Sequence, residues 1–503
     1  MPNLVVRLII LVMLETSGVS FCYAEDRPCP VFMPDCRWDA FVRYRFEDVN
    51  EYPSPNQKIE GEAHTTRIAA GLDSGTFKGF GLYGQIEYVG SINGKDYSDG
   101  GVNGVNPAQR ATILDAEGFE IKQGNIRFDG REFHNAPILN ASLLRLGQQE
   151  IKHRADPFQR FLGNVGFRQH FQTYDAARVT NRSVRDLVID YAYIWNVNTF
   201  FGDRNRTKGN RGLAGHAINF LYDGDYLRDP AGRQRGTLEA YSYLLDFDET
   251  ENAQLSSQTY GLRLDTKRPN PLGLSRTEFV GNFESALQIG YRSNPQRSVH
   301  GYFHSELGLN YFPMEKDLPK DLPMALSPDS IGVLFGYELL GGSGANVDCL
   351  EAGFCAPAAA FQTPLGTNHA FLGANDRFAA QTPRDGVHDR YVTLKSQFAP
   401  WNSTLTIQGS YHDFESDHDN YRYGREWVIS AEWFPFSDNS GIWEQCRNNS
   451  KLLRMTLSRN LLVGVQYAIY QADPNVENAR NNSLKLNQDV EKIWAFVQWK
   501  LDY

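Results

Sequence analysis

The sequence predicts a transmembrane antiparallel β-barrel of about eighteen strands. From residue 38 to the end, segments of about ten residues alternate apolar and polar side chains, with turn-forming residues between them. No apolar run beyond the first residues approaches the roughly 18 to 20 residues that a membrane-spanning helix needs. The mean hydropathy of -0.47 fits strands that expose one face to lipid and the other to water.

The composition excludes two other classes of protein. With 31 Phe, 25 Tyr and 8 Trp among 503 residues, the chain has too many aromatic side chains for a disordered protein. The net charge of -10 argues against a nucleic-acid partner, because such a partner requires a basic surface.

The first residues have the pattern of a secretory signal peptide. An apolar run from Leu4 to Leu14, interrupted by Arg7, precedes a small-x-small cleavage pattern that ends at Ala24. A lipoprotein signal with Cys22 as the acceptor fits less well, because Phe21 stands where a small residue is required. We therefore expect a signal peptide at 1–24, a periplasmic N-terminal segment at 25–37 and an outer-membrane barrel at 38–503.

The expected strands follow from the alternation of side chains. Val42, Tyr44 and Phe46 share one face of the first strand, whereas Arg43 and Arg45 share the other. The same rule predicts strands near 38–48, 61–72, 76–92, 117–128, 139–153, 171–181, 186–198, 214–223, 235–247, 255–267, 276–293, 296–312, 329–340, 387–398, 403–414, 420–434, 460–472 and 489–503. An even number is expected of a barrel that a single chain closes, because both chain ends must meet on the periplasmic side.

The last strand alternates up to an aromatic residue, Tyr503. This ending resembles the signal by which barrels are handed to the barrel assembly machinery of the outer membrane. The outward apolar face of every strand makes the outer-membrane lipid a further expected partner.

The connections between strands differ greatly in length. Those after odd-numbered strands are expected outside the cell, and residues 341–386 then form the largest surface loop. Two other long connections are 93–116 outside the cell and 435–459 in the periplasm. Long structureless connections in a compact protein are usually functional or disordered, and in a channel the functional option is that they fold into the pore.

Five of the six cysteines lie beyond the signal peptide. In an oxidising periplasm the close pairs Cys29 with Cys36 and Cys349 with Cys355 are candidate disulfides. Metal binding by these pairs is the lesser interpretation, because neither spacing is that of a zinc site and no His completes them. Cys446 is left as a free thiol or as a partner in another pairing.

Seven segments carry a resemblance to a known family. They are FLGNVGFRQ at 161–169, QTYDAAR at 172–178, DYAYIWNVN at 190–198, GYE at 336–338, FQTPL at 361–365, ANDRF at 374–378 and YHDF at 411–414. Together they resemble the alginate export family of outer-membrane barrels. The resemblance implies an eighteen-stranded monomer with an arginine-rich constriction that passes an anionic polysaccharide. It also implies gating by the loop after the third strand and the turn after the sixteenth, here 93–116 and 435–459.

The alternation of side chains along each strand, called parity below, places a set of basic residues in the lumen. They are Arg43, Arg45, Arg67, Arg145, Arg178, Arg263 and Lys395. Guanidinium groups bind carboxylates through paired hydrogen bonds, and charges on the wall of a narrow pore set its ion selectivity. Parity also directs acidic residues inward: Glu47, Glu87, Asp190, Asp265, Glu284, Glu306, Glu338 and Glu426. Two interpretations of these lumen charges therefore stay open. They form an anion-selective constriction, or they pair with one another across strands.

No motif indicates an enzyme, a cofactor or a metal ion. Residues 79–84 match the glycine spacing of a dinucleotide site, but they lie in an alternating strand without a following helix. The acidic segment 413–419 lacks the turn glycine of an EF-hand. We assign no catalytic residue, although a Ser and a His on neighbouring strands of an outer-membrane hydrolase would leave no sequence motif.

The leading hypothesis is a passive outer-membrane channel for an anionic polysaccharide or its oligomers, alginate-like by resemblance. The alternatives within transport are a general porin and a porin for small anions or acidic sugars. A hydrolase or an adhesin is the competitor from another class. No plug domain is expected before residue 38, so energised import is not expected.

Overall fold

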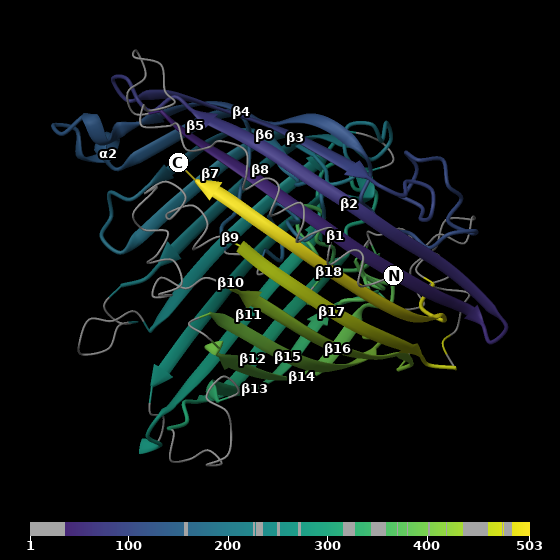
Figure 1. Ribbon diagram of the computed structural model, residues 1–503. Coiled ribbons are helices and arrows are strands. Elements are labelled where there is room, and N and C mark those ends of the chain that lie inside the picture. Colours follow the sequence, from purple (N-terminus) through teal and green to yellow (C-terminus); the bar gives the residue numbers. More distant parts are fainter. Residues whose placement is uncertain are drawn as a thin grey trace, which may run out of the picture.

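Eighteen segments of alternating side chains form eighteen antiparallel strands, and each strand pairs with its neighbours in the sequence. β18 pairs with β1 and closes the sheet into a barrel, as the yellow and purple strands of Figure 1 show. The computed structural model describes residues 36–154, 159–224, 227, 235–248, 252–269, 273–314, 327–343, 359–369, 371–379, 381–400, 403–418, 420–435, 461–474, 476 and 485–502. The predicted fold class, a transmembrane antiparallel β-barrel, is confirmed.

Every predicted strand has a counterpart in the structure. The first nine are β1 (Arg37–Ser54), β2 (Gln57–Asp73), β3 (Phe80–Ser91), β4 (Gly118–Asp129), β5 (Ser142–Gln149), β6 (Thr173–Asn181), β7 (Leu187–Asn198), β8 (Asn210–Tyr222) and β9 (Gly236–Phe247). The other nine are β10 (Ser257–Pro269), β11 (Thr277–Gly290), β12 (Val299–Tyr311), β13 (Pro328–Leu340), β14 (Val387–Phe398), β15 (Thr404–Glu415), β16 (Arg422–Phe434), β17 (Leu461–Ala472) and β18 (Asp489–Asp502).

Several strands begin a few residues later than predicted, and at β5 short helical turns account for the delay. Between β4 and β5 the chain forms the 3-10 turn η1 (Gly130–Glu132) and the helix α2 (Pro137–Asn140), so β5 starts after the predicted residue 139. Pro137 stands at the start of α2, where its missing N–H costs nothing. A second 3-10 turn, η3 (Ala253–Leu255), precedes β10. In the part of the chain that the structure describes, no helix is long and apolar enough to cross a membrane.

The two faces of the barrel wall differ as the alternation predicts. On β2, Ile68 and Leu72 are about half exposed on the outer face, whereas Arg67, the residue before Ile68, is fully buried on the inner face. On β1, Val42 is exposed outward, whereas Arg45 is buried inward. The apolar outer face therefore meets lipid, and the lumen is lined by charged and polar side chains.

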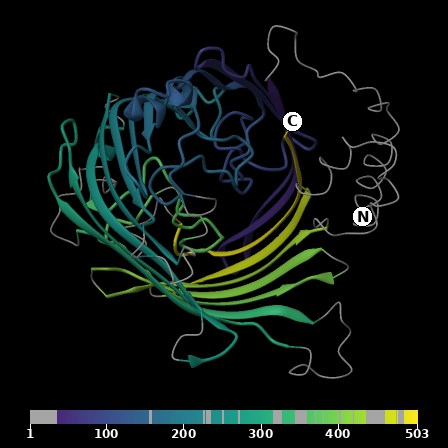
Figure 2. The same cartoon turned by 90° about the vertical axis from the view of Figure 1, so that its left-hand side faces the viewer.

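Three long connections bring their side chains into the lumen, and Figure 2 shows loops drawn in blue and green inside the ring of strands. They are the β3–β4 loop (92–117) and the described parts of the β5–β6 loop (150–172) and the β13–β14 loop (341–386). All three follow odd-numbered strands, so they enter the barrel from one end. The expectation that 341–386 is a surface loop is wrong for the described residues from 359 to 386, which turn inward.

The β5–β6 and β13–β14 loops pack against each other. Leu162 and Leu365 form a parallel bridge, and the N–H of Gly163 donates to the carbonyl of Leu365 at 3.0 Å. The ring of Phe161 contacts Phe361 of the other loop, with centroids 5.7 Å apart. These two loops form a small apolar core inside the lumen. This core holds the loops together in place of the regular hydrogen-bond ladder of a sheet.

Two earlier expectations fall on undescribed residues. The periplasmic connection 435–459 lies outside the described residues except for its first position, so its entry into the pore stays a prediction. Cys36 is disulfide-bonded, but Cys29, Cys349, Cys355 and Cys446 also lie outside the described residues. The pairings Cys29 with Cys36 and Cys349 with Cys355 therefore stay predictions.

Candidate functional site: the lumen and its loops

The inward arginines of β1 hold the β5–β6 loop. Arg43 donates from Nη1 to the carbonyls of Gly166 at 2.9 Å and Arg168 at 3.1 Å, and its other donors face Gln498 on β18. Arg45 donates to the carbonyl of Phe167, the residue between these two. The backbone carbonyls of a loop have no ladder partners, so wall guanidinium groups satisfy them. Arg43 and Arg45 face the lumen as predicted, but they anchor a loop and have few donors left for a ligand.

A cluster of charges lies beside this anchor. Glu47 pairs with Arg45, with Lys492 of β18 at 2.9 Å and with Arg168 of the loop at 3.3 Å. Arg168 also reaches Asp376 of the β13–β14 loop at 2.9 Å. Burial alone would raise the pKa of Asp376, but Lys492, the hydrogen bond from His369, and Arg168 hold that pKa well below its usual range. Both lumen loops thus meet at one ionic cluster.

A second set of contacts holds the start of the β5–β6 loop. Arg154 donates to Glu239 at 2.7 Å and to Glu284 at 2.7 Å, and Arg263 of β10 shares Glu284 at 3.0 Å. Arg263 also pairs with Asp265 at 2.7 Å. The predicted lumen residue Arg263 is therefore neutralised by wall carboxylates.

A third anchor links the β5–β6 loop to the wall and to the other loop at once. Nε of the fully buried Arg160 donates to Glu338 at 2.8 Å, and its Nη1 donates to the carbonyl of Thr367 at 2.9 Å. Tyr302 donates to the same Glu338 oxygen at 2.9 Å. Because Arg160 is the loop's contact to β13 and to Thr367 of the neighbouring loop, it holds both loops in place.

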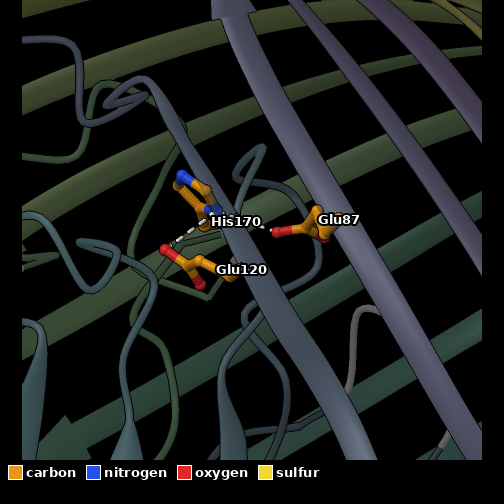
Figure 3. Close-up of side chains that lie close together, drawn as sticks. All are labelled: Glu87, Glu120 and His170. Atoms are coloured by element: carbon orange, nitrogen blue, oxygen red, sulfur yellow. Dashed lines mark hydrogen bonds and ion pairs between the residues drawn. The ribbon is translucent and has the colours of Figure 1, made fainter.

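The buried Glu87, Glu120 and His170 are the one described group that could hold a metal ion, with ligand atoms within 4.8 Å of one another. Figure 3 shows the imidazole of His170 between the two carboxylates. However, Lys122 pairs with Glu120 at 2.9 Å and Arg67 pairs with Glu87 at 2.5 Å. Two cations already neutralise the two carboxylates, so the group fits an ion-pair network better than a metal centre. The predicted lumen residue Arg67 belongs to this network.

Another group has the atoms of a hydrolytic triad. Nδ1 of His412 lies 2.7 Å from Asp389, and its Nε2 lies 3.1 Å from the hydroxyl of Ser410. Acyl transfer also needs free donors for an oxyanion. Ser410 sits in regular register with β14 and β16, so the backbone N–H groups beside it belong to sheet ladders. The group therefore gives no support to a hydrolase.

Three arginines form a row across neighbouring strands. Arg127 of β4 lies opposite Arg145 of β5, which lies opposite Arg178 of β6. The outer two are neutralised: Arg127 pairs with Asp73, and Arg178 pairs with Asp190 at 2.9 Å. Among the described residues, the side chain of Arg145 has no ion pair or hydrogen bond. Arg145 and Arg178 were predicted from parity, and the structure places them side by side.

Sequence reasoning missed several lumen cations. Lys395 is exposed in the lumen as predicted, but Lys122, Arg127 and Lys492 were not assigned. Lys492 shares the parity of Gln498, so alternation alone could have found it. Lys122 sits where the register of β3 and β4 shifts between Gln85 and Ile86, and parity fails across such a bulge. The loop arginines had no periodicity to reveal them.

The fold and the lumen define a class, the outer-membrane β-barrel whose interior is narrowed by its own loops. Solved structures with this fold include OpdK of Pseudomonas aeruginosa with vanillate, at 12% identity and a TM-score of 0.57, covering 94% of this chain and 100% of that chain. OccAB2 of Acinetobacter baumannii is similar at 13% identity and a TM-score of 0.58, with the same coverage. OccK9 (OpdG) of Pseudomonas aeruginosa has 11% identity and a TM-score of 0.56.

No family model matches the chain, and no curated protein matches it in sequence. The resemblance to the alginate export family therefore finds no support beyond the shared barrel class. At such low identities the solved structures show the fold alone, which is that of outer-membrane barrels. The outer-membrane location follows from this fold.

Proposed function

We propose that the protein is a passive outer-membrane channel for small organic anions. The observation that carries the proposal is the arginine row, in which Arg145 stands unpaired between Arg127 and Arg178. Like charges placed opposite each other on neighbouring strands repel and destabilise a sheet. The row therefore destabilises the folded sheet, but its positive charge attracts anions.

The charge of the row can act on a solute in transit. Asp73 and Asp190 cancel the outer arginines, so the guanidinium of Arg145 supplies one uncompensated positive charge on the lumen wall. A fixed charge on a narrow pore raises the local concentration of the opposite ion. The planar guanidinium fork also matches a carboxylate.

Two further observations favour a small solute. The β5–β6 and β13–β14 loops occupy part of the lumen, and buried ion pairs fix both of them to the wall. In addition, the structurally similar OpdK was crystallised with vanillate, an aromatic carboxylate. Polysaccharide export, the second candidate, has the resemblance of segments such as 161–169 and 374–378 in its favour. Those same segments lie in the loops that narrow the lumen, so the small-anion function has more support.

Uptake of glucuronate and glucose into proteoliposomes tests the proposal, because these sugars differ by one carboxylate. We expect the channel to admit glucuronate faster than glucose. A unit charge about 7 Å away contributes about 0.6 kcal/mol even at the dielectric constant of water, so Arg145→Ala should lower the rate ratio about threefold. Lys58→Ala, at a surface ion pair with Glu60, is the matched control. A wild-type channel that prefers glucose would refute the proposal, and passage of long uronate polymers would favour the second candidate.

A further inference from the structure

The β13–β14 loop places a carboxylate in the middle of a cationic cluster. Asp376 accepts hydrogen bonds from Arg168 at 2.9 Å and from His369 at 2.6 Å, and it pairs with Lys492. Arg168 belongs to the β5–β6 loop and Lys492 to β18, so the three partners come from three segments. The carboxylate of Asp376 thus occupies the place where a bound anion would be held.

The tip of the loop is held in a strained conformation. Asp376 has a φ of 61°, which residues other than glycine rarely adopt. Glu426 of β16 accepts the N–H groups of Ala374 and, at 3.2 Å, Asn375. Tertiary contacts therefore fix the tip, and a loss of the contacts of Asp376 would release strain.

The cations around Asp376 would have an incomplete set of partners without it. Arg168 and Lys492 share the single wall carboxylate Glu47, which already pairs with Arg45. If Asp376 moves away, two cations face one shared carboxylate. The site that remains is therefore electropositive and suited to an external carboxylate.

Aromatic rings border the same position. Phe167 stacks on His369 with ring centroids 3.7 Å apart and an interplanar angle of 8°, and Trp494 lies 6.4 Å from the same imidazole. A planar apolar body attached to a carboxylate would find ring surfaces beside the cations. The chemistry of the site therefore fits a small aromatic carboxylate.

We infer that Arg168, Lys492 and His369 form a binding site for the carboxylate of such an anion, and that Asp376 is a tethered carboxylate that occupies it until the anion displaces it. This inference rests on the proposed function and adds a site and its internal competitor. A binding site that is free for only a fraction of the time has its apparent affinity lowered by that fraction. If Asp376 occupies the site about nine-tenths of the time, its removal tightens anion binding about tenfold.

The test is the concentration of benzoate that halves the chloride current through single channels in a planar bilayer. Asp376→Asn should lower this concentration about tenfold, because the competitor is gone. Lys492→Gln should raise it at least about tenfold, because a cation of the site is gone. The matched control is Glu51→Gln, which removes the same charge from the partner of Arg377, the next residue of the loop, and leaves the site intact. Its half-blocking concentration should stay within about threefold of wild type.

If Asp376→Asn and Glu51→Gln tightened benzoate binding equally, the inference would be overturned. Equal tightening would mean that a loosened loop or a changed electrostatic field in the lumen is the cause, not the loss of a competitor. An unchanged benzoate block in Lys492→Gln would also overturn it, even if Asp376→Asn failed to insert. These outcomes differ from failure of the proposed function. A channel that prefers glucuronate to glucose but shows no effect of Asp376→Asn refutes the tethered carboxylate alone. A channel with no such preference refutes the proposed function.

Discussion

Arg160 is the contact whose loss should open the lumen most. It donates to Glu338 on β13 and to Thr367 of the β13–β14 loop, and its guanidinium lies 4.9 Å from the ring of Phe371. Arg160→Leu removes these contacts and leaves Glu338 buried with Tyr302 as its hydrogen-bond donor. We expect the two lumen loops to separate from the wall.

The magnitude follows from burial. Both members of the Arg160 and Glu338 pair are fully buried, and breaking such a pair by removing one partner costs about 3 to 5 kcal/mol. Each 1.4 kcal/mol is a factor of about ten, so the docking equilibrium of the loops shifts more than about a hundredfold toward the undocked state. Replacing both partners with leucine removes the unpaired charge, so the double variant should recover most of the loss.

Single-channel recording in planar bilayers and limited proteolysis measure this shift. Arg160→Leu should raise conductance and current noise and expose the loops to protease, whereas the double variant with Glu338→Leu should resemble wild type. Arg131→Leu is the control, because its 83% exposed side chain pairs with Asp129 at the surface. Wild-type conductance and protease resistance in Arg160→Leu would refute the reasoning that this pair docks the loops.

Three other predictions concern assembly, disulfides and pH. Gly147 has a φ of 119° and an added Cβ would lie 2.4 Å from a β4 carbonyl oxygen, so Gly147→Val should reduce the heat-modifiable folded band. Gly301→Val, where nothing lies within 4 Å, should leave that band intact. A non-reducing digest should join the peptides of Cys349 and Cys355, and alkylation of both without reduction would count against their pairing. Because the folded pKa of Asp376 is lowered, the stability that its ion pairs give the lumen loops is lost only as pH falls through that lowered value. The conductance should therefore stay constant from pH 7 to pH 5. A rise in conductance centred between pH 5 and 6 would contradict this.

The strands and their faces could be predicted from the sequence because a strand has a period of two. Arg45 and Arg67 were assigned to the lumen on parity alone, and both are buried there. What parity does not give is the partner of each side chain. Arg45 meets the carbonyl of Phe167, more than a hundred residues away, and only the closed barrel brings them together.

The inward loops could not be predicted in the same way. The β5–β6 loop (150–172) has no periodicity, and length alone directed attention to 93–116 and 435–459. One usable signal was present: Phe161 and Leu162 are apolar residues in a connection between strands, where an exposed loop would be polar. Their burial against Phe361 and Leu365 explains that composition.

The reversal potential across a potassium chloride gradient tests the central claim most directly, with Arg145→Ala recorded beside wild type. Since Arg145 is the uncompensated charge of the row, we predict an anion-selective wild type and a reversal potential that moves toward zero in the variant. The shift should shrink at high ionic strength, because salt screens a charge that is only partly buried in the lumen wall. A cation-selective wild type, or a variant with the selectivity of wild type, would contradict the account of this protein as a channel for small organic anions.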